Sequence, residues 1–341
     1  MNLTAELGGY PLFTQGQWPE HDVFGLRDSH VHAFSLGRHA LRAAILSKQP
    51  QRVWLPFLTC HTVIETVKKL GVPISFYHIT SDGVPDGLEL AEHELGVINN
   101  YFGLTHTSLA WTNFWLYQNP MQWVIDNTQS LTCGNLFESH WSFTSPRKFI
   151  SVTDGGILFT SENNPLDFSI LPELKDESWA RIQWLFRAID DCTRSASYEA
   201  YLSYRHEHVQ SIPYARMSEV TSYLLRILDV KQIIAQRNMR FSLLLQRLGM
   251  THPWAALPLN ERASPIGFPV CLPNAQQVQS KLAQHKIFSI RYWPMADNKL
   301  TALNDVERAF ALETLFLPLD QDYSLAHWEI LTTLGCGAAN V

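Results

Sequence analysis

Two short segments of the chain carry side chains that can do chemistry together. Lys148 lies in the stretch 142–156, shortly after Asp126 and Gln129. A primary amine held in place forms a Schiff base with an aldehyde, and a carboxylate facing a pyridine nitrogen keeps that ring protonated as an electron sink. The residue types and their order therefore predict an enzyme that uses pyridoxal 5'-phosphate.

The segments around these residues are typical of an α/β sheet with helices packed on its faces. From about residue 35 to residue 160, apolar runs of strand length alternate with stretches of helical period. Six strands are predicted, at residues 52–56, 74–79, 97–102, 123–126, 140–143 and 156–159. The fourth strand would carry Asp126 to the carboxyl edge of the sheet, where ligands bind in open α/β folds.

Helical patterns dominate the middle of the chain and a shorter mixed block follows them. The apolar residues within 61–70 fall on one face of a predicted helix, which Gly71 would end. Residues 177–248 are typical of long helical segments, one of which covers 217–248. After Gly249, strands are predicted at 268–272, 287–293 and 315–319, with helices near 274–285 and 325–334. We expect a large domain over 1–249, with a helical bridge, and a small C-terminal α+β domain over 250–341.

Composition and charge exclude several classes of partner. The 341 residues are 46% hydrophobic and 17% charged, with a net charge of −6 and no basic stripe, so nucleic acid is not expected as a partner. Five scattered cysteines without a Cys-x-x-Cys argue against a disulfide framework or structural zinc and fit a reducing cytoplasm. No signal peptide or run of about 18 apolar residues indicates secretion or membrane insertion.

The order of the motifs resembles that of the DegT/DnrJ/StrS aminotransferases, which are fold type I pyridoxal phosphate enzymes acting on nucleotide-linked sugars. Residues 35–41, Ser-Leu-Gly-Arg-His-Ala-Leu, are similar to the family's Ser-Gly-x-x-Ala-Leu at the first helix of the large domain. Asp126 and Gln129 match its Asp-x-x-Gln spacing, and Gly155 and Gly156 stand seven and eight residues after Lys148, as in the family. The resemblance covers nearly the whole chain and implies a mainly parallel mixed sheet.

The resemblance also implies a role for each of these residues. Ser35, Gly37 and Arg38 would bind the cofactor phosphate at a helix N-terminus, where backbone N–H groups and a partial positive charge favour an anion. Asp126 would pair with the pyridine nitrogen, and Gln129 would approach the phenolic oxygen. Lys148 would hold the aldehyde, be displaced by an amino donor and then act as a general base.

Three positions depart from the family pattern. Phe143 stands five residues before the lysine, where the family has a phosphate-binding serine, which leaves three hydroxyl residues nearby as substitutes: Ser142, Thr144 and Ser145. Tyr214 replaces the Asn of a segment that helps complete the partner subunit's site in the relatives. Cys60 replaces the aromatic residue that stacks on the cofactor ring, so the thiol contacts the ring or another aromatic stacks there: His61, Phe57 or Phe102.

Together these features predict a homodimer with shared active sites that moves an amino group from an amino acid such as glutamate to a nucleotide-linked keto sugar, in surface glycan biosynthesis. Sugar dehydratases of this group carry His in place of the lysine, so Lys148 favours amine transfer.

Two alternatives stay open from the sequence. The departures at Cys60 and Tyr214 allow a non-catalytic fold type I protein that acts as a binding or regulatory module. The segment Asp28-Ser-His30-Val-His32 also resembles the Asp-x-His-x-His entry of metal-dependent amidohydrolases. That second alternative requires further ligands from an eightfold β/α barrel, for which the helix-rich middle of the chain leaves too few strands.

Overall fold

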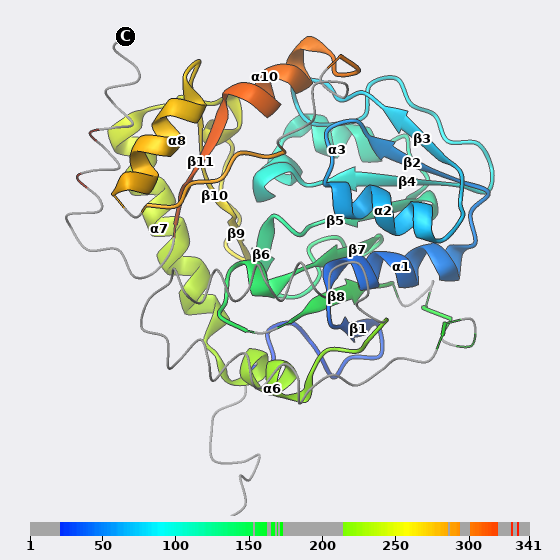
Figure 1. The fold of residues 1–341 in the computed structure, drawn as a ribbon. Helices are drawn as coiled ribbons and strands as arrows, with labels where there is room; N and C mark the ends of the chain where they lie inside the picture. The colour runs from blue at the N-terminus through cyan, green and yellow to red at the C-terminus, as the bar shows by residue number, and fades with distance from the viewer. Residues whose placement is uncertain are drawn as a thin grey trace, which may run out of the picture.

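The computed structural model describes residues 21–152, 154–161, 165–167, 169, 171–172, 214–285, 287–293, 301–319, 329 and 333. Its centre is a seven-stranded sheet in the order β1-β8-β7-β5-β4-β2-β3 (Figure 1). The strands are β1 Val31–Phe34, β2 Arg52–Pro56, β3 Ile74–Tyr77, β4 Glu94–Asn99, β5 Trp123–Asp126, β7 Trp141–Thr144 and β8 Gly156–Phe159. Only β8 runs against the others, because it pairs antiparallel with both β7 and β1. The mainly parallel mixed sheet expected from the sequence is confirmed.

Alternating side chains of the strands build a separate core on each face of the sheet. Val97 and Val124 pack on the face that α1 (Gly37–Lys48) and α2 (His61–Lys69) cover. Their neighbours Ile98 and Ile125 point to the other face and pack against Trp111 of α3 (Leu109–Trp115). This period of two, with both faces apolar, is why the strands read as continuous hydrophobic runs.

Two consecutive helices cover the second face near β8. Helices α6 (Glu219–Ile227) and α7 (Val230–Leu248) contribute Leu225 and Ile234 to a cluster with Ile157 of β8. The expected helical segment 217–248 is thus divided in two, because the Asp229 side chain accepts a hydrogen bond from the Gln232 N–H and begins a new helix. The expected helical stretch 177–213 lies outside the described residues.

The C-terminal part adds two small sheets and two helices. Strand β10 (Gly267–Cys271) pairs antiparallel with β11 (Thr314–Pro318), beside α8 (Ala275–Gln284) and α10 (Asp305–Glu313). Strand β9 (Ala263–Pro265) pairs with β6 (Ser130–Thr132), which follows the Asp126 segment directly. The helix expected near 325–334 lies outside the described residues, apart from positions 329 and 333.

Short 3₁₀ helices connect these elements: η1 Tyr101–Gly103, η2 Thr105–Thr107, η3 Pro120–Gln122, η4 Pro146–Lys148 and η6 Pro253–Ala256. None of the helices in the described part of the chain has both the length and the apolar character needed to cross a membrane.

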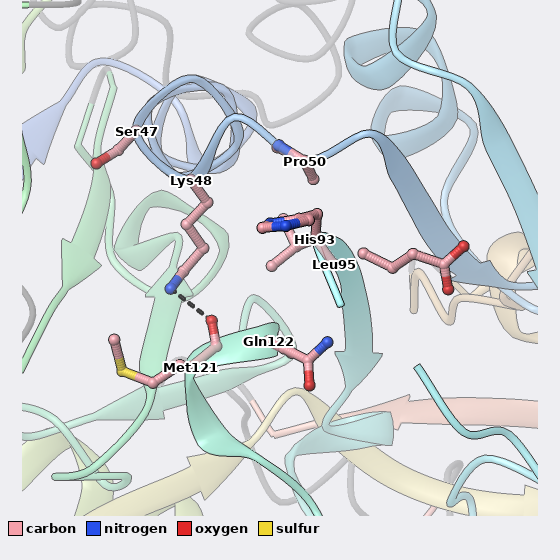
Figure 2. A pocket seen from close by; sticks show the side chains of 8 residues that line it. Ser47, Lys48, Pro50, His93, Leu95, Met121 and Gln122 are labelled. Carbon is pink, nitrogen blue, oxygen red and sulfur yellow. Dashed lines mark hydrogen bonds between the residues drawn. The ribbon is translucent and has the colours of Figure 1, made fainter. Parts of the chain in front are cut away.

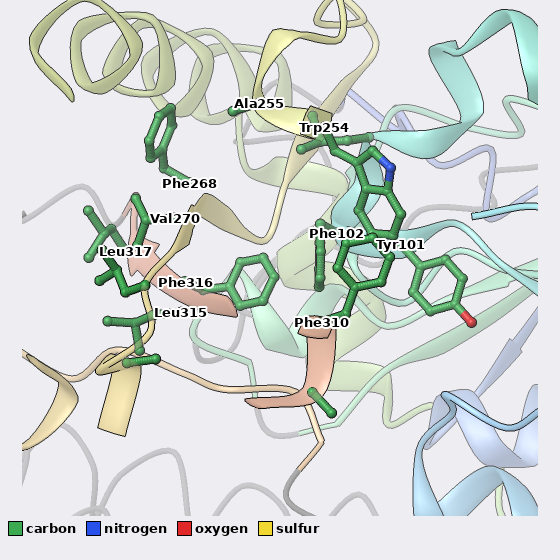
Figure 3. Close-up of a cluster of buried hydrophobic side chains, with 14 of the residues drawn as sticks. Tyr101, Phe102, Trp254, Ala255, Phe268, Val270, Phe310, Leu315, Phe316 and Leu317 are labelled. Atoms are coloured by element: carbon green, nitrogen blue, oxygen red, sulfur yellow. The ribbon is translucent and has the colours of Figure 1, made fainter. Parts of the chain in front are cut away.

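Aromatic packing is continuous across residue 249, the expected boundary between the two domains (Figure 3). The Tyr101 ring stacks on Trp254 at 5.6 Å between centroids, and the Phe102 ring lies 4.0 Å from that of Phe316. Residues of the sheet region and of the C-terminal part therefore share one apolar cluster.

Two expected strands differ from the structure. The strand expected at 97–102 is β4, which ends at Asn99 because Phe102 adopts a left-handed backbone with φ 62°. The strand expected at 287–293 is wrong apart from one bridge, Ile290 to Phe316. Three residues of this segment pack in or against the shared aromatic cluster, namely Ile287, Tyr292 and Trp293, whereas Phe288 and Ile290 are exposed.

Candidate active site

The predicted site residues follow strand ends that meet at one edge of the sheet. Strands β1, β5 and β7 end at Phe34, Asp126 and Thr144, and their parallel direction brings these ends together. The antiparallel strand β8 begins at Gly156 on the same edge. The segments that contain Ser35, Gln129 and Lys148 therefore converge from distant parts of the sequence.

Asp126 is a buried carboxyl group at this edge. Its Oδ1 accepts a hydrogen bond from the Thr128 N–H at 2.9 Å. Burial raises the pKa of Asp126 above its ordinary value, and the positive charge of Lys148 and the hydrogen bonds of Thr128 oppose that rise. A cationic partner for this carboxylate would thus be strongly favoured.

The amine of Lys148 lies at the same edge although its side chain is exposed. Its Nζ donates to Thr128 Oγ1 at 2.9 Å, and its charge acts on Asp126. Thr128 thus contacts both functional groups, through its backbone N–H and through its hydroxyl. Sequence reasoning missed Thr128, although it lies inside the Asp126–Gln129 motif.

The N-terminus of α1 forms a seat that can take an anion. The N-cap residue Leu36 makes no capping hydrogen bond with its side chain, and the first turn of the helix holds no acidic residue. A Cβ placed on Gly156 would overlap the backbone of Leu36 and Gly37, so only glycine allows β8 to approach the helix start this closely. A Cβ on Gly37 would lie 3.3 Å from Thr128 Cγ2 and 3.5 Å from Ser145 Cβ, which places both residues beside the seat.

The predicted phosphate ligands occupy different places around this seat. Ser35 is fully buried and its Oγ lies 2.9 Å from His39 Nδ1, while Arg38 is half-buried in the first turn of α1. Ser145 donates to the Gly155 carbonyl at 3.2 Å. Ser142 lies inside β7 and donates to Asn135 Oδ1 at 2.9 Å, away from the strand end.

Gln129 follows the end of β5 and Cys60 follows the end of β2, with β4 between these two strands. The Gln129 Oε1 accepts the Phe102 N–H at 2.6 Å, so this side chain holds the left-handed turn after β4. Cys60 is half-buried at the start of α2, with its Sγ 3.2 Å from Thr62 Oγ1.

The three aromatic residues expected to replace the missing stacking partner have other contacts. His61 is exposed and lies 3.5 Å from Glu65. Phe57 stacks on His78 with 4.6 Å between ring centroids, and Phe102 is buried against Phe316. The structure places all three rings in contacts other than with Cys60.

Tyr214 packs against residues of β1 and α1. Its ring stacks on Phe34 at 5.7 Å and meets Arg42 at 4.9 Å, and among the described residues its buried hydroxyl has no hydrogen-bond partner. Burial raises the pKa of Tyr214 well above its ordinary value.

A second contact missed by sequence reasoning fixes the segment before β8. Asp154 is buried, and its carboxylate accepts hydrogen bonds from the Ser218 N–H at 2.9 Å and hydroxyl at 2.7 Å. Ser218 in turn caps α6. These bonds connect the segment carrying Gly155 and Gly156 to the helix after Tyr214.

The histidines of the amidohydrolase alternative do not form a metal site. The open seven-stranded sheet is not the barrel that this alternative requires, and the described residues contain no group of three His, Cys, Asp or Glu side chains placed to hold a metal. His32 instead lies 3.3 Å from Thr160 Oγ1 in the buried edge strand, where burial lowers its pKa to about 4.

A pocket of about 260 Å³ lies at the opposite, amino-terminal edge of the sheet (Figure 2). Lys48 lines it, donating to the Met121 carbonyl at 2.8 Å and lying 4.3 Å from the centre of the Trp141 ring. Burial lowers the pKa of Lys48 to about 8. The Lys48 amine shares its pocket with the Glu94 carboxylate, which forms an ion pair with Arg52 at 3.2 Å.

No protein-family model and no curated protein matches the sequence. Among solved structures, the sugar aminotransferase CalS13 from Micromonospora echinospora is similar with a TM-score of 0.59 and 10% identity, covering 90% of this chain and 87% of that chain. A DegT DnrJ EryC1 StrS aminotransferase from Brucella abortus gives 0.59 and 16%, over 92% and 86%. The chain has the fold of these aminotransferases.

The structure of 3-amino-5-hydroxybenzoic acid synthase is similar with a TM-score of 0.60 and 13% identity, covering 92% of this chain and 87% of that chain. At these identities the likeness shows the aminotransferase fold, and the case for activity depends on the residues at the strand ends.

Proposed function

We propose that this protein is a pyridoxal phosphate-dependent aminotransferase. The observation that carries the proposal is the meeting, through Thr128, of the Lys148 amine, the buried Asp126 carboxylate and the uncapped start of α1. An amine, an acid and an anion seat at one edge are the three groups that this cofactor needs.

The residues present fit the cofactor group by group. The phosphate would lie at the α1 N-terminus beside Gly37 and Ser145, where the positive end of the helix dipole favours an anion. The pyridine nitrogen would face Asp126, and the aldehyde would join Lys148. When bound, the cofactor withdraws electrons from the substrate carbon next to the nitrogen.

Each side chain has a role that its surroundings support. Asp126 would keep a proton on the ring nitrogen, because a buried carboxylate gains most from a cationic partner. Lys148, whose long side chain is exposed, would carry a proton to and from the substrate carbon. Thr128 would orient both, since it binds the carboxylate and the amine at once.

We further propose a homodimer whose subunits complete each other's sites. Lys148 is open to solvent in the single chain. A second copy that covers this edge would exclude water from Lys148.

The proposed reaction moves an amino group from an amino acid such as glutamate to a nucleotide-linked keto sugar, for a surface glycan. The sugar assignment is supported by the description of CalS13 as a sugar aminotransferase. The synthase of 3-amino-5-hydroxybenzoic acid marks the competing possibility of a carbocyclic acceptor.

Absorbance spectra of the purified protein test the proposal. The protein with pyridoxal phosphate should absorb visible light, and L-glutamate should remove that band by converting the cofactor to its amine form. A keto-sugar nucleotide should then restore the band and yield an amino sugar detectable by mass spectrometry. Lys148→Ala is the control and should show neither change. If glutamate and the other amino donors all leave the band unchanged, the result would favour the non-catalytic binding module.

A further inference from the structure

The loop at the end of β4 is bonded to the loops on both of its sides at the carboxyl edge of the sheet. On one side, Asn99 Nδ2 donates to Thr59 Oγ1 at 3.3 Å, in the loop after β2. On the other side, the Phe102 N–H donates to Gln129 Oε1 at 2.6 Å, in the loop after β5. Residues 99–103, the β4 loop, therefore connect two loops of the candidate site.

Asn100 is the residue of the β4 loop that binds the segment carrying the buried acid. It is completely buried, its backbone N–H donates to the Asp126 carbonyl at 3.0 Å, and its Nδ2 donates to Asn127 Oδ1 at 2.7 Å. Asn127 stands between Asp126 and Thr128, whose hydroxyl accepts from Lys148. Two hydrogen bonds from Asn100 thus hold the chain that presents the carboxylate and this hydroxyl.

The other end of the Asn100 amide fixes its orientation. Its Oδ1 accepts the His106 N–H at 3.2 Å and the Thr105 hydroxyl at 3.3 Å. His106 Nδ1 lies 3.3 Å from the same oxygen, and since burial lowers the pKa of His106 to about 4, its ring is neutral at pH 7. Nδ1 therefore donates to Oδ1, while Nε2 accepts from Asn260 Nδ2 at 3.5 Å. With these donors at Oδ1, Nδ2 is the atom of the amide that faces Asn127.

The acid-bearing segment is bonded on its second side to β7. The Asn127 N–H donates to the Phe143 carbonyl at 2.8 Å, and the Asn127 carbonyl accepts the Thr144 hydroxyl at 3.3 Å. Residues 126–128 are thus held between β7 and the β4 loop. Without the Asn100 side chain, the Asn127 side chain would lose its bond to the β4 loop.

We propose that Asn100 is a positioning residue for the Asp126 carboxylate, acting through its hydrogen bond to Asn127. The inference rests on the proposed use of pyridoxal phosphate, whose ring nitrogen would face that carboxylate. Charge-assisted hydrogen bonds require a defined geometry, so a small displacement of the carboxylate costs ligand affinity even though the carboxylate itself is retained.

Hydrogen exchange in the cofactor-free protein measures the restraint on this segment directly. The Thr128 N–H, which donates to Asp126, should exchange about 3- to 10-fold faster in Asn100→Ala than in the wild type, because losing one net hydrogen bond changes a local opening equilibrium by about that factor. Asn127→Ala removes the same bond from the other side and should have the same effect. The two substitutions together should add little more than either one alone.

Asn304→Ala is the matched control for a general loss of stability. This half-buried asparagine accepts the Glu307 N–H at 2.8 Å and donates to the Ile79 carbonyl at 3.1 Å, beyond the end of the edge strand β3. Its replacement should lower the melting temperature and leave the exchange of the Thr128 N–H unchanged. If Asn100→Ala does not fold, Asn127→Ala carries the same comparison, because it keeps the bonds that Asn100 Oδ1 accepts.

Affinity for pyridoxamine phosphate tests the link to the carboxylate, and this compound binds without a covalent bond to Lys148 because it has no aldehyde. Calorimetric titration would compare Asn100→Ala with the wild type, and then the same substitution in the Asp126→Asn background. We expect about 3- to 10-fold weaker binding in the first comparison and less than about a twofold change in the second, because no carboxylate is left to be displaced.

Three results would overturn the role of Asn100 and leave the proposed function intact. They are equal weakening in both backgrounds, unchanged exchange of the Thr128 N–H in Asn100→Ala, and an effect of Asn304→Ala on affinity as large as that of Asn100→Ala. If instead the wild type binds neither pyridoxal phosphate nor pyridoxamine phosphate, the proposed function fails and the positioning role fails with it.

Discussion

Thr128 links the two groups on which the chemistry depends. It donates its backbone N–H to Asp126 and accepts the Lys148 amine with its hydroxyl. Within the described residues, these contacts offset only part of the hydration that the buried Asp126 carboxylate has lost. This agrees with the proposed role of Asp126 as the partner of a cationic ring.

The substitution Asp126→Asn should stabilise the cofactor-free protein. Because the folded-state pKa of Asp126 is raised, the native state binds its proton more tightly than the unfolded state, and stability is lost as pH rises from 3.8 through the raised value. The Asn variant keeps the hydrogen bond from Thr128 and carries no charge. Its melting temperature should exceed that of the wild type at about pH 7 and approach it at about pH 4.

The same variant should bind pyridoxal phosphate more weakly and lose amine transfer, because a neutral amide does not hold a proton on the ring nitrogen. Asp167→Asn is the matched control: that aspartate is exposed, hydrogen bonds from Ser169 lower its pKa, and its replacement should bring no gain in stability. A difference between Asp126→Asn and wild type that does not change with pH would contradict the account.

The principal site residues were predictable because their spacing is encoded locally. Asp126 ends a clear apolar strand, and the offset from Lys148 to the glycine pair can be counted directly. The choice between Ser142 and Ser145 was not predictable, since it depends on β7 ending at Thr144. Only residues beyond that end reach the edge of the sheet.

The glycine at the start of β8 sets how closely that strand approaches α1. Gly156→Ala would place a methyl group into the backbone of Leu36 and Gly37, which are parts of the main chain that do not move aside. We expect a loss of about 2 kcal/mol or more in the free energy of unfolding. Weaker binding of inorganic phosphate should accompany it, because the helix start would be displaced.

Gly87→Ala is the control for this experiment, because it adds a methyl group at a strained backbone position without a steric overlap. Gly87 has a φ of 62°, and no heavy atom lies within 4 Å of the point where an alanine methyl would stand. Its replacement should therefore cost about 1 kcal/mol and leave phosphate binding unchanged. Denaturant unfolding and phosphate titration measure both effects. Equal losses for the two variants would show that close approach at Gly156 is unimportant.

Most strands of the large sheet were predictable because short apolar runs that alternate with helical segments are typical of buried strands. Strand β1 was missed because it is only four residues long and His32 interrupts its apolar pattern. The opposite error occurred at 287–293, where Ile287, Tyr292 and Trp293 pack in or against the aromatic cluster without forming a strand. Periodicity reports burial, and only long-range pairing decides whether a buried segment is a strand.

The N-terminal and C-terminal parts of the described chain are joined by polar as well as apolar contacts. Glu307 of α10 is fully buried, and its carboxylate accepts the Ile79 N–H and lies against His78 Nδ1, both at 2.9 Å. The described residues before and after position 249 are therefore joined by both polar and apolar contacts. We expect the whole protein to unfold in a single transition.

Glu307→Ala tests this coupling. It would leave the Ile79 N–H and the Asn304 N–H without their acceptor and should lower the free energy of unfolding by about 2–3 kcal/mol, with one transition retained. Asp305→Ala, at the exposed neighbour on the same helix, should cost less than about 1 kcal/mol. Two separate transitions, only one of them shifted by Glu307→Ala, would instead show domains that unfold independently.

Mapping the lysine that carries the cofactor tests the central claim most directly. Borohydride reduction of the protein with bound pyridoxal phosphate would fix the cofactor on its lysine, and peptide mass spectrometry would locate it. Lys48 is a demanding internal comparison, because burial lowers its pKa to about 8 and leaves its amine partly neutral. The account predicts the label on Lys148, and its loss in Lys148→Ala but not in Lys48→Ala. A label on Lys48, or no label on Lys148 at saturating cofactor, would contradict it.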